Sequence, residues 1–180
     1  MQEDLELINR FLNGNMEAFE MLVRKHQNRV INTAYSLAGN VSDAEDIAQD
    51  VFLKIYHGLS SFKAQAKFSS WLYRITVNTA YDFLRGHKHK AESLEEADCE
   101  NIRAKENNPD ILTRELIQGA LGEMPFDFRS VLTLREIEGL SYEEISQALK
   151  INIGTVESRL FRARKILKGI LTRKGALKNV

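Results

Sequence analysis

The amino-acid sequence predicts an all-α protein, and three observations lead to this prediction. Both prolines of the 180-residue chain lie late, at Pro109 and Pro125. Strict alternation of Val, Ile and Thr, which is typical of half-buried strands, is missing. Apolar residues instead recur three and four positions apart, which is the spacing of amphipathic helices. With 43% hydrophobic residues, the chain is long enough for one compact domain or two small ones.

Four helices are expected in the N-terminal half of the chain. The first two each end at a pair of adjacent Asn and Gly residues, which stop helices. Ser42 and Glu45 have the spacing of a capping box, so we expect the third helix to begin there and to reach about Leu59. The fourth covers residues 68–90. Together these helices can bury a core, which predicts a domain at residues 1–90.

Residues 91–110 are predicted to form a flexible acidic linker, because they are rich in charge and poor in aromatic residues. Residues 91–115 carry eight carboxylates and three cations, whereas residues 153–180 carry eight cations and one carboxylate. The net charge of zero therefore conceals two segments of opposite sign. A neutral total does not exclude a nucleic-acid partner for such a chain.

A second small helical domain is expected at residues 111–180. Its helices are predicted near residues 111–121, 127–138, 141–149 and 155–171. The last two have the parts of a helix-turn-helix, in which a capped helix is followed by a short turn and a recognition helix. Ser141 and Glu144 supply the capping-box pattern of the first of these two helices.

The outer face of the last helix suits the major groove of duplex DNA. Ser158, Phe161, Arg162 and Lys165 follow an i, i+3, i+4, i+7 series, and Arg159 flanks the buried side. Arginine reads guanine edges, serine bonds to either base, an aromatic ring contacts a thymine methyl, and further cations hold phosphate. A basic helix that is merely solvated is the alternative. The capped helix and short turn that precede this one favour DNA binding.

The fourth helix combines an apolar face with a polar face that could contact DNA. At about 100° per residue, Asn78, Tyr81 and Arg85 fall within about 40° of Arg74, while Leu72, Thr76, Thr79 and Phe83 fall near the opposite side. Trp71 borders the polar face, Lys63 and Lys67 precede the helix, and Lys88 and Lys90 lie at its C-terminal end. Stacking rings, cations and a base-pairing amide together suit single-stranded DNA. Alternatively, Trp71 and Tyr73 are ordinary core residues, and periodicity alone favours neither interpretation.

Three motifs, in this order, resemble those of the extracytoplasmic-function sigma factors, the smallest bacterial transcription initiation factors of the sigma-70 family. The sequence DAEDIAQDVFLKIY at 43–56 resembles the family's core-polymerase-binding segment. The sequence FSSWLYRITVNTAYDFLR at 68–85 resembles its minus-ten recognition segment. The sequence LSYEEISQALKINIGTVESRLFRARKIL at 140–167 resembles its minus-thirty-five reader. The resemblance covers nearly the whole chain.

This resemblance implies three sets of site residues. The first segment would dock on a coiled coil of the largest RNA polymerase subunit through Asp46, Gln49 and Asp50. The minus-ten set is Lys63, Lys67, Trp71, Arg74, Asn78, Tyr81 and Arg85, with Asn78 contacting a flipped base that the 60–68 loop helps to hold. The minus-thirty-five set is Thr155, Glu157, Ser158, Arg159, Phe161, Arg162 and Lys165. Glu157 departs from the family pattern, because many relatives have a cation or a neutral residue there; its carboxylate can accept a hydrogen bond from cytosine N4.

The predicted function is therefore that of a sigma factor. It would bind core RNA polymerase, read the minus-ten and minus-thirty-five elements and stabilise melted DNA. The polymerase flap and an anti-sigma factor are further expected partners. The cytoplasm is the expected compartment, because no stretch approaches the roughly 18 apolar residues of a membrane span. Enzymatic activity, a cofactor and a metal are not expected, since no Gly-rich phosphate loop occurs and Cys99 is the only cysteine.

Two alternatives stay open at this point. A helix-turn-helix transcriptional regulator would bind duplex DNA without being a polymerase subunit, and it would have no use for Trp71 or Asn78. A metal-dependent nuclease would use the carboxylates of Asp43, Glu45, Asp46 and Asp50. These carboxylates lie around one helix and do not converge from separate elements, which disfavours two-metal geometry.

Overall fold

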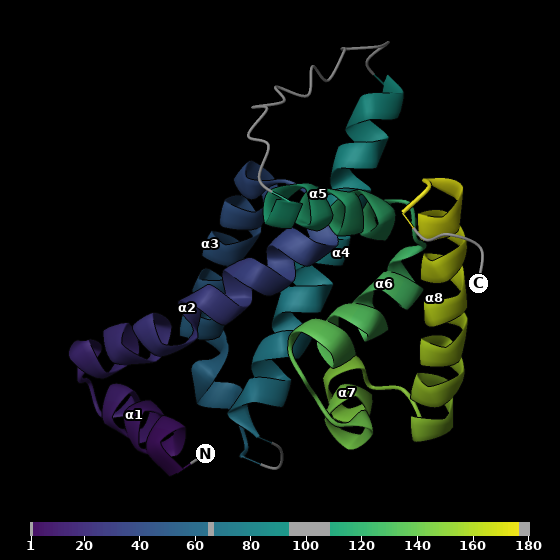
Figure 1. Cartoon of the computed structure of the whole chain (residues 1–180). Helices are drawn as coiled ribbons and strands as arrows, with labels where there is room; N and C mark the ends of the chain where they lie inside the picture. The colour runs from purple at the N-terminus through teal and green to yellow at the C-terminus, as the bar shows by residue number, and fades with distance from the viewer. Residues whose placement is uncertain (1, 65–66, 94–108, 177–180) are drawn as a thin grey trace.

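The computed structural model describes residues 2–64, 67–93 and 109–176, and these residues form two groups of helices (Figure 1). The N-terminal group contains α1 (Gln2–Leu12), α2 (Met16–Ala38), α3 (Val41–Gly58), the 3-10 turn η1 (Leu59–Ser61) and α4 (Phe68–Ser93). The C-terminal group contains α5 (Pro109–Gly122), α6 (Phe126–Leu132), the π-helical turn η2 (Thr133–Ile137), α7 (Tyr142–Leu149) and α8 (Ile153–Arg173). Every regular element within the described ranges is helical, which confirms the all-α prediction with two small helical domains. Most of the predicted linker, residues 94–108, lies outside the described residues.

The start of α3 differs from the sequence prediction. Ser42 and Glu45 do not form the capping box expected there. The side chain of Asn40 caps the helix instead, because its oxygen accepts from the Asp43 N–H at 2.9 Å while its amide donates to the Asp43 carboxylate at 2.8 Å. Asparagine is among the strongest N-cap residues, and its use moves the helix start toward the N-terminus. Ser42 therefore lies inside the first turn of α3.

The helix predicted at residues 127–138 is observed as α6 followed by η2. The backbone N–H of Glu138 donates to Thr133 O at 3.1 Å, which is the i to i−5 bond of a π-helix. Gly139 follows with φ of +68°, a conformation that glycine adopts without a steric penalty. Glu138 follows the π-helical turn directly, so the winding of this turn sets the direction of the Glu138 side chain.

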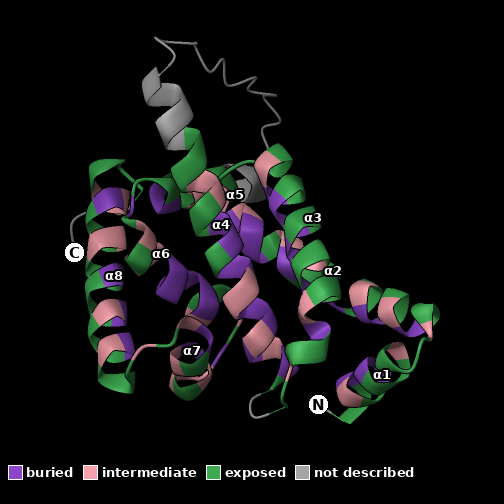
Figure 2. Cartoon of the chain, turned by 180° about the vertical axis from the view of Figure 1, so that it is seen from behind, coloured by how far each residue is buried: buried purple, intermediate pink, exposed green. Residues whose placement is uncertain are grey.

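The buried residues of both groups form one continuous core, and Figure 2 colours them purple on the ribbon. In the N-terminal group, α2, α3 and α4 pack on one another through residues that include Val30, Ile47 and Leu72. In the C-terminal group, α6 packs on α8 through residues that include Val131 and Leu160. The two groups also meet, because α7 packs on α4 and α5 contacts α2 (Figure 1). The two predicted domains therefore share an interface.

A charged cluster attaches α1 to α2. Asp4 is only 7% exposed; its carboxylate lies 2.8 Å from Lys25 Nζ and 3.1 Å from Nε2 of the buried His26. Burial lowers the pKa of His26 below 6.5, so the imidazole is neutral at pH 7 and its contact with Asp4 is a hydrogen bond. Burial alone would raise the pKa of Asp4, but the hydrogen bonds from Lys25 and His26 outweigh it, and that pKa is lowered.

Acid is expected to weaken the attachment of α1 in two steps. The pKa of His26 is lower in the folded chain than in the unfolded one, so the free energy of unfolding decreases once the pH falls below about 6.5. The lowered pKa of Asp4 stabilises the fold above its unfolded value, and this stability is lost as the pH falls through the folded value. Urea unfolding across this pH range measures both steps. His26→Gln should remove the first step; an unchanged slope just below about pH 6.5 in this variant would contradict the assignment.

Candidate nucleic-acid interface

Helix α4 has the two faces that its sequence predicts. The buried face includes Leu72, Thr76 and Thr79, and the exposed face includes Asn78, Tyr81 and Arg85. On the exposed face, the Arg85 guanidinium lies 5.7 Å from the centroid of the Tyr81 ring. Arg74 is half-buried one turn before Asn78. An amide, an aromatic ring and two guanidinium groups therefore line the side of α4 that faces away from the core.

The two aromatic residues whose position the sequence left open lie in different environments. Tyr73 is a core residue, 3% exposed, and its hydroxyl donates to Glu138 Oε2 at 2.6 Å. Burial, together with that carboxylate, raises the pKa of Tyr73, so its hydroxyl stays protonated. Trp71 is half-buried, with its ring centroid 5.4 Å from that of Phe62 and 5.8 Å from that of Phe68. Of the two, only Trp71 borders the outer surface.

A pocket of about 230 Å³ opens beside the N-terminal end of α4. Its walls come from residues 61–64, Ser70, Trp71 and Arg74 of the N-terminal group and from Gln147 of α7. The Ser70 hydroxyl is buried there without a hydrogen-bond partner. An indole ring, a planar guanidinium and hydroxyl groups are suited to a flat aromatic ligand that also carries hydrogen-bonding edges.

The cations expected beside α4 have different surroundings. Lys63 is exposed at the pocket, whereas Lys67 Nζ lies 2.7 Å from Glu144 Oε1 on α7. The hydrogen bond from Lys67, followed by the bond from the Ser141 backbone, lowers the pKa of Glu144. The side chains of Lys88 and Lys90 lie outside the described residues. Lys67 is therefore held by the C-terminal group in this arrangement.

Helices α7 and α8 form the predicted helix-turn-helix. The Ser141–Glu144 capping box is confirmed, because the Ser141 hydroxyl accepts from Glu144 N at 3.2 Å and the Glu144 carboxylate accepts from Ser141 N at 2.9 Å. Lys150 ends α7 in the left-handed conformation, with φ of +54°. Val156, Leu160 and Ala163 on α8 are buried.

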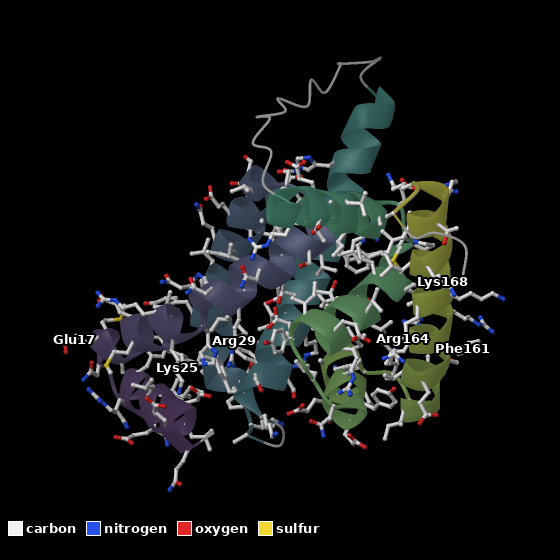
Figure 3. All side chains as sticks on the ribbon, viewed as in Figure 1. Glu17, Lys25, Arg29, Phe161, Arg164 and Lys168 are labelled. Atoms are coloured by element: carbon white, nitrogen blue, oxygen red, sulfur yellow. The ribbon has the colours of Figure 1, made fainter. Side chains whose placement is uncertain are left out.

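The outer side of α8 exposes most of the residues that were predicted to contact duplex DNA. Phe161 is 73% exposed, and Figure 3 shows it projecting from α8 into solvent. Glu157, Ser158, Arg162 and Lys165 are also exposed. Arg159 is half-buried, and its guanidinium lies 2.9 Å from the Asp127 carboxylate of α6. Thr155 is half-buried, with its carbonyl accepting from the Ser158 hydroxyl at 3.1 Å.

The acidic side of α3 forms a separate surface on the N-terminal group. Asp46, Gln49 and Asp50 are exposed, and Leu53, one turn further along, is 58% exposed. Within residues 2–64, 67–93 and 109–176, no three His, Cys, Asp or Glu side chains are grouped so that they could hold a metal ion. None of the helices in these ranges is long and apolar enough to cross a membrane.

Several residues beside these surfaces were not anticipated from the sequence. Four residues of the C-terminal group contact α4, its pocket or Lys67 just before α4: Glu138, Glu144, Gln147 and Phe126. No local pattern predicts these contacts between the groups, because they depend on how the two groups pack against each other.

Comparisons with known proteins show the family to which the chain belongs. The sequence matches the family Sigma-70 region 2 over residues 22–90 and the family Sigma-70, region 4 over residues 114–167. It is 34% identical to RNA polymerase sigma-H factor of Pseudomonas aeruginosa, covering 92% of each chain. It is 36% identical to ECF RNA polymerase sigma-E factor of Escherichia coli strain K12, covering 91% of this chain and 92% of that one.

Two solved structures are also similar to the chain. A structure of CnrH in complex with the cytosolic domain of CnrY is similar with a TM-score of 0.74 at 27% identity, covering 95% of this chain and 98% of that one. The sigma factor RpoE of Bartonella quintana, solved with the anti-sigma factor NepR, shares the fold with a TM-score of 0.71 at 24% identity, covering 87% of this chain and 98% of that one. The chain therefore belongs to the sigma-70 family, as an RNA polymerase sigma factor of the extracytoplasmic-function group.

Proposed function

We propose that this sigma factor binds core RNA polymerase through α3, captures an unpaired minus-ten base on α4 and reads the minus-thirty-five duplex with α8. The observation that carries the proposal is the exposed Asn78 and Tyr81 stripe of α4 beside a pocket walled by Trp71 and Arg74. A base inside a duplex presents no free face, so a stacking surface of this kind is useful where strands are separated.

Promoter opening then proceeds without enzymatic activity. Unstacking a base costs a few kcal/mol, and stacking on a protein aromatic ring returns roughly 1–3 kcal/mol per base. Hydrogen bonds from Asn78 to the base edge and from cations to phosphate add to this return. Binding energy therefore supplies what a motor would take from ATP.

The polymerase contact uses charge complementarity. The exposed Asp46, Gln49 and Asp50 side chains suit a basic coiled coil of the largest polymerase subunit. The C-terminal group would contact the polymerase flap. We place the protein in the cytoplasm, where core polymerase and DNA are found. An anti-sigma partner is proposed because the similar RpoE was solved with the anti-sigma factor NepR.

A gel-shift assay with and without core polymerase tests the proposed function. At nanomolar concentration, the chain alone should not shift promoter duplex in the gel, whereas the chain with core polymerase should shift it. The complex with core polymerase should also start transcription from that promoter. Tight binding of duplex by the chain alone would indicate a helix-turn-helix regulator that acts without polymerase.

Charge reversal on α3 should weaken polymerase binding specifically. The double variant Asp46→Lys/Asp50→Lys is expected to lower affinity for core polymerase by roughly tenfold or more, because like charges would face each other across the contact. Fluorescence anisotropy with purified core polymerase measures this affinity. Glu20→Lys is the matched control, because Glu20 is an exposed carboxylate that lies on α2 and not on α3. An equal loss in both variants would remove α3 from the contact.

A further inference from the structure

Helix α8 carries a single acidic residue, Glu157, although the helix is otherwise rich in Arg and Lys. Glu157 is exposed. At about 100° per residue it lies about 40° from Phe161, which is 73% exposed and is the most outward side chain of this helix. The carboxylate therefore belongs to the side of α8 that is proposed to face the minus-thirty-five duplex.

No cation of α8 neutralises Glu157. The positions three and four residues before and after it on the helix are all uncharged: Ile153, Gly154, Leu160 and Phe161. Arg164, two turns further along the same side, donates to Glu136 at 2.7 Å, and Arg159 pairs with Asp127 at 2.9 Å. In the part of the chain that the structure describes, no cation pairs with Glu157. Its carboxylate oxygens are therefore free to accept hydrogen bonds from a ligand.

Helix stability does not account for a carboxylate at this position. Acidic side chains stabilise a helix through the unsatisfied N–H groups of its first turn, and the effect falls off beyond that turn. The first turn of α8 contains no acidic residue, and Glu157 follows as the fifth residue of the helix. Beside DNA an unpaired carboxylate is also repelled by phosphate, so only a donor on a base edge could offset its presence.

The base edges of the major groove differ in what they offer to a carboxylate. Guanine presents N7 and O6 and thymine presents O4, all of which are acceptors and repel it. Adenine presents an N6 donor, but its N7 acceptor lies beside that donor. Cytosine presents only the N4 amino donor. A free carboxylate in the groove therefore selects cytosine.

The surroundings of Glu157 allow a base pair to come close. Gly154, one turn earlier on the same side, has no atom within 4 Å of the position that a Cβ would take. Phe161, one turn later, can contact a thymine methyl. Four residues of α-helix rise about 6 Å, which is close to two base-pair steps of about 3.4 Å. This side of α8 therefore suits a cytosine that has a thymine one or two base pairs away.

We propose that Glu157 determines specificity in the minus-thirty-five element by selecting a cytosine through its N4 amino group, with Phe161 on a thymine one or two base pairs away. The inference rests on the proposed reading of this duplex by α8 and adds the base that the chain selects. An arginine at the same position would select guanine instead, because its guanidinium donates to O6 and N7.

Transcription by the holoenzyme from promoters randomised over the minus-thirty-five element tests this inference. Wild type should enrich cytosine at one position, and any other base there should weaken promoter binding by about fivefold or more. Glu157→Ala should remove the preference at this position alone, and Glu157→Arg should change it to guanine. Glu115→Ala is the matched control, because Glu115 is an exposed carboxylate of the C-terminal group that lies on α5, and it should keep the wild-type preference.

A carboxylate that is merely solvated would give a different result. Its removal would strengthen binding to every minus-thirty-five sequence by the same factor, because only repulsion of phosphate would be lost. This outcome, or control by Glu157 of a base other than cytosine, would overturn the inference while α8 would still read the element. A wild type that enriches no base in the minus-thirty-five element would overturn both the inference and the proposed role of α8.

Discussion

Asn78→Ala is expected to slow open-complex formation by roughly 5- to 150-fold, the equivalent of losing about 1–3 kcal/mol of base contact. Asn78 is exposed on α4, so truncating it leaves the core intact and removes only the amide that can pair with a base edge. Fluorescence of a base analogue in the minus-ten element, followed after mixing promoter with holoenzyme, measures the rate.

Two controls make this result specific. Asn28→Ala removes an exposed amide from α2 and should leave the opening rate unchanged. The affinity of Asn78→Ala for core polymerase should equal that of wild type. A loss of polymerase affinity with a normal opening rate would move Asn78 from the DNA surface to the polymerase contact.

Leu160 and Phe161 are adjacent on α8, and alanine substitutions at the two should have opposite consequences. Leu160 is 1% exposed, so Leu160→Ala leaves a cavity and should lower the free energy of unfolding by about 2–5 kcal/mol. Phe161 is 73% exposed, so Phe161→Ala should change that free energy by less than about 0.5 kcal/mol.

DNA binding by Phe161→Ala should be affected although its free energy of unfolding is nearly unchanged. Phe161→Ala is expected to weaken holoenzyme binding to the minus-thirty-five duplex by about fivefold or more, because an apolar contact with the groove is lost. Urea unfolding and footprinting of the minus-thirty-five region measure the two effects. A Phe161→Ala chain that is destabilised but binds the upstream duplex normally would make Phe161 a packing residue.

The spacing of apolar residues predicted the helices and the two faces of α4, because side chains three or four positions apart lie on the same face of a helix. The N-cap residue of a helix is harder to predict where two nearby side chains could each take that position. Ser141 has no rival and caps α7 as predicted, whereas Asn40 precedes Ser42 and takes its place at α3. A sequence pattern shows which residues can cap, and only the folded chain shows which one does.

Contacts between the two groups had no sequence signal. Tyr73 lies on α4 where periodicity permits either face, and the partner of its hydroxyl is Glu138, far away in the chain. The sequence predicts Lys67 as a free cation for DNA, whereas in the folded chain Lys67 pairs with Glu144 of α7. The surroundings of Tyr73 and Lys67 are set by packing between the two domains. Periodicity within either domain carries no information about that packing.

The contact between the two domains depends on the number of residues in the π-helical turn η2. A π-helical turn accommodates one residue more than an α-helical turn, so loss of a single residue between Thr133 and Ile137 would let this stretch wind as ordinary α-helix. Each residue of helix rotates its successors by about 100°, and Glu138 would then point elsewhere. Insertions and deletions in this short stretch, more than substitutions, would decide whether a relative of this chain can fold back on itself.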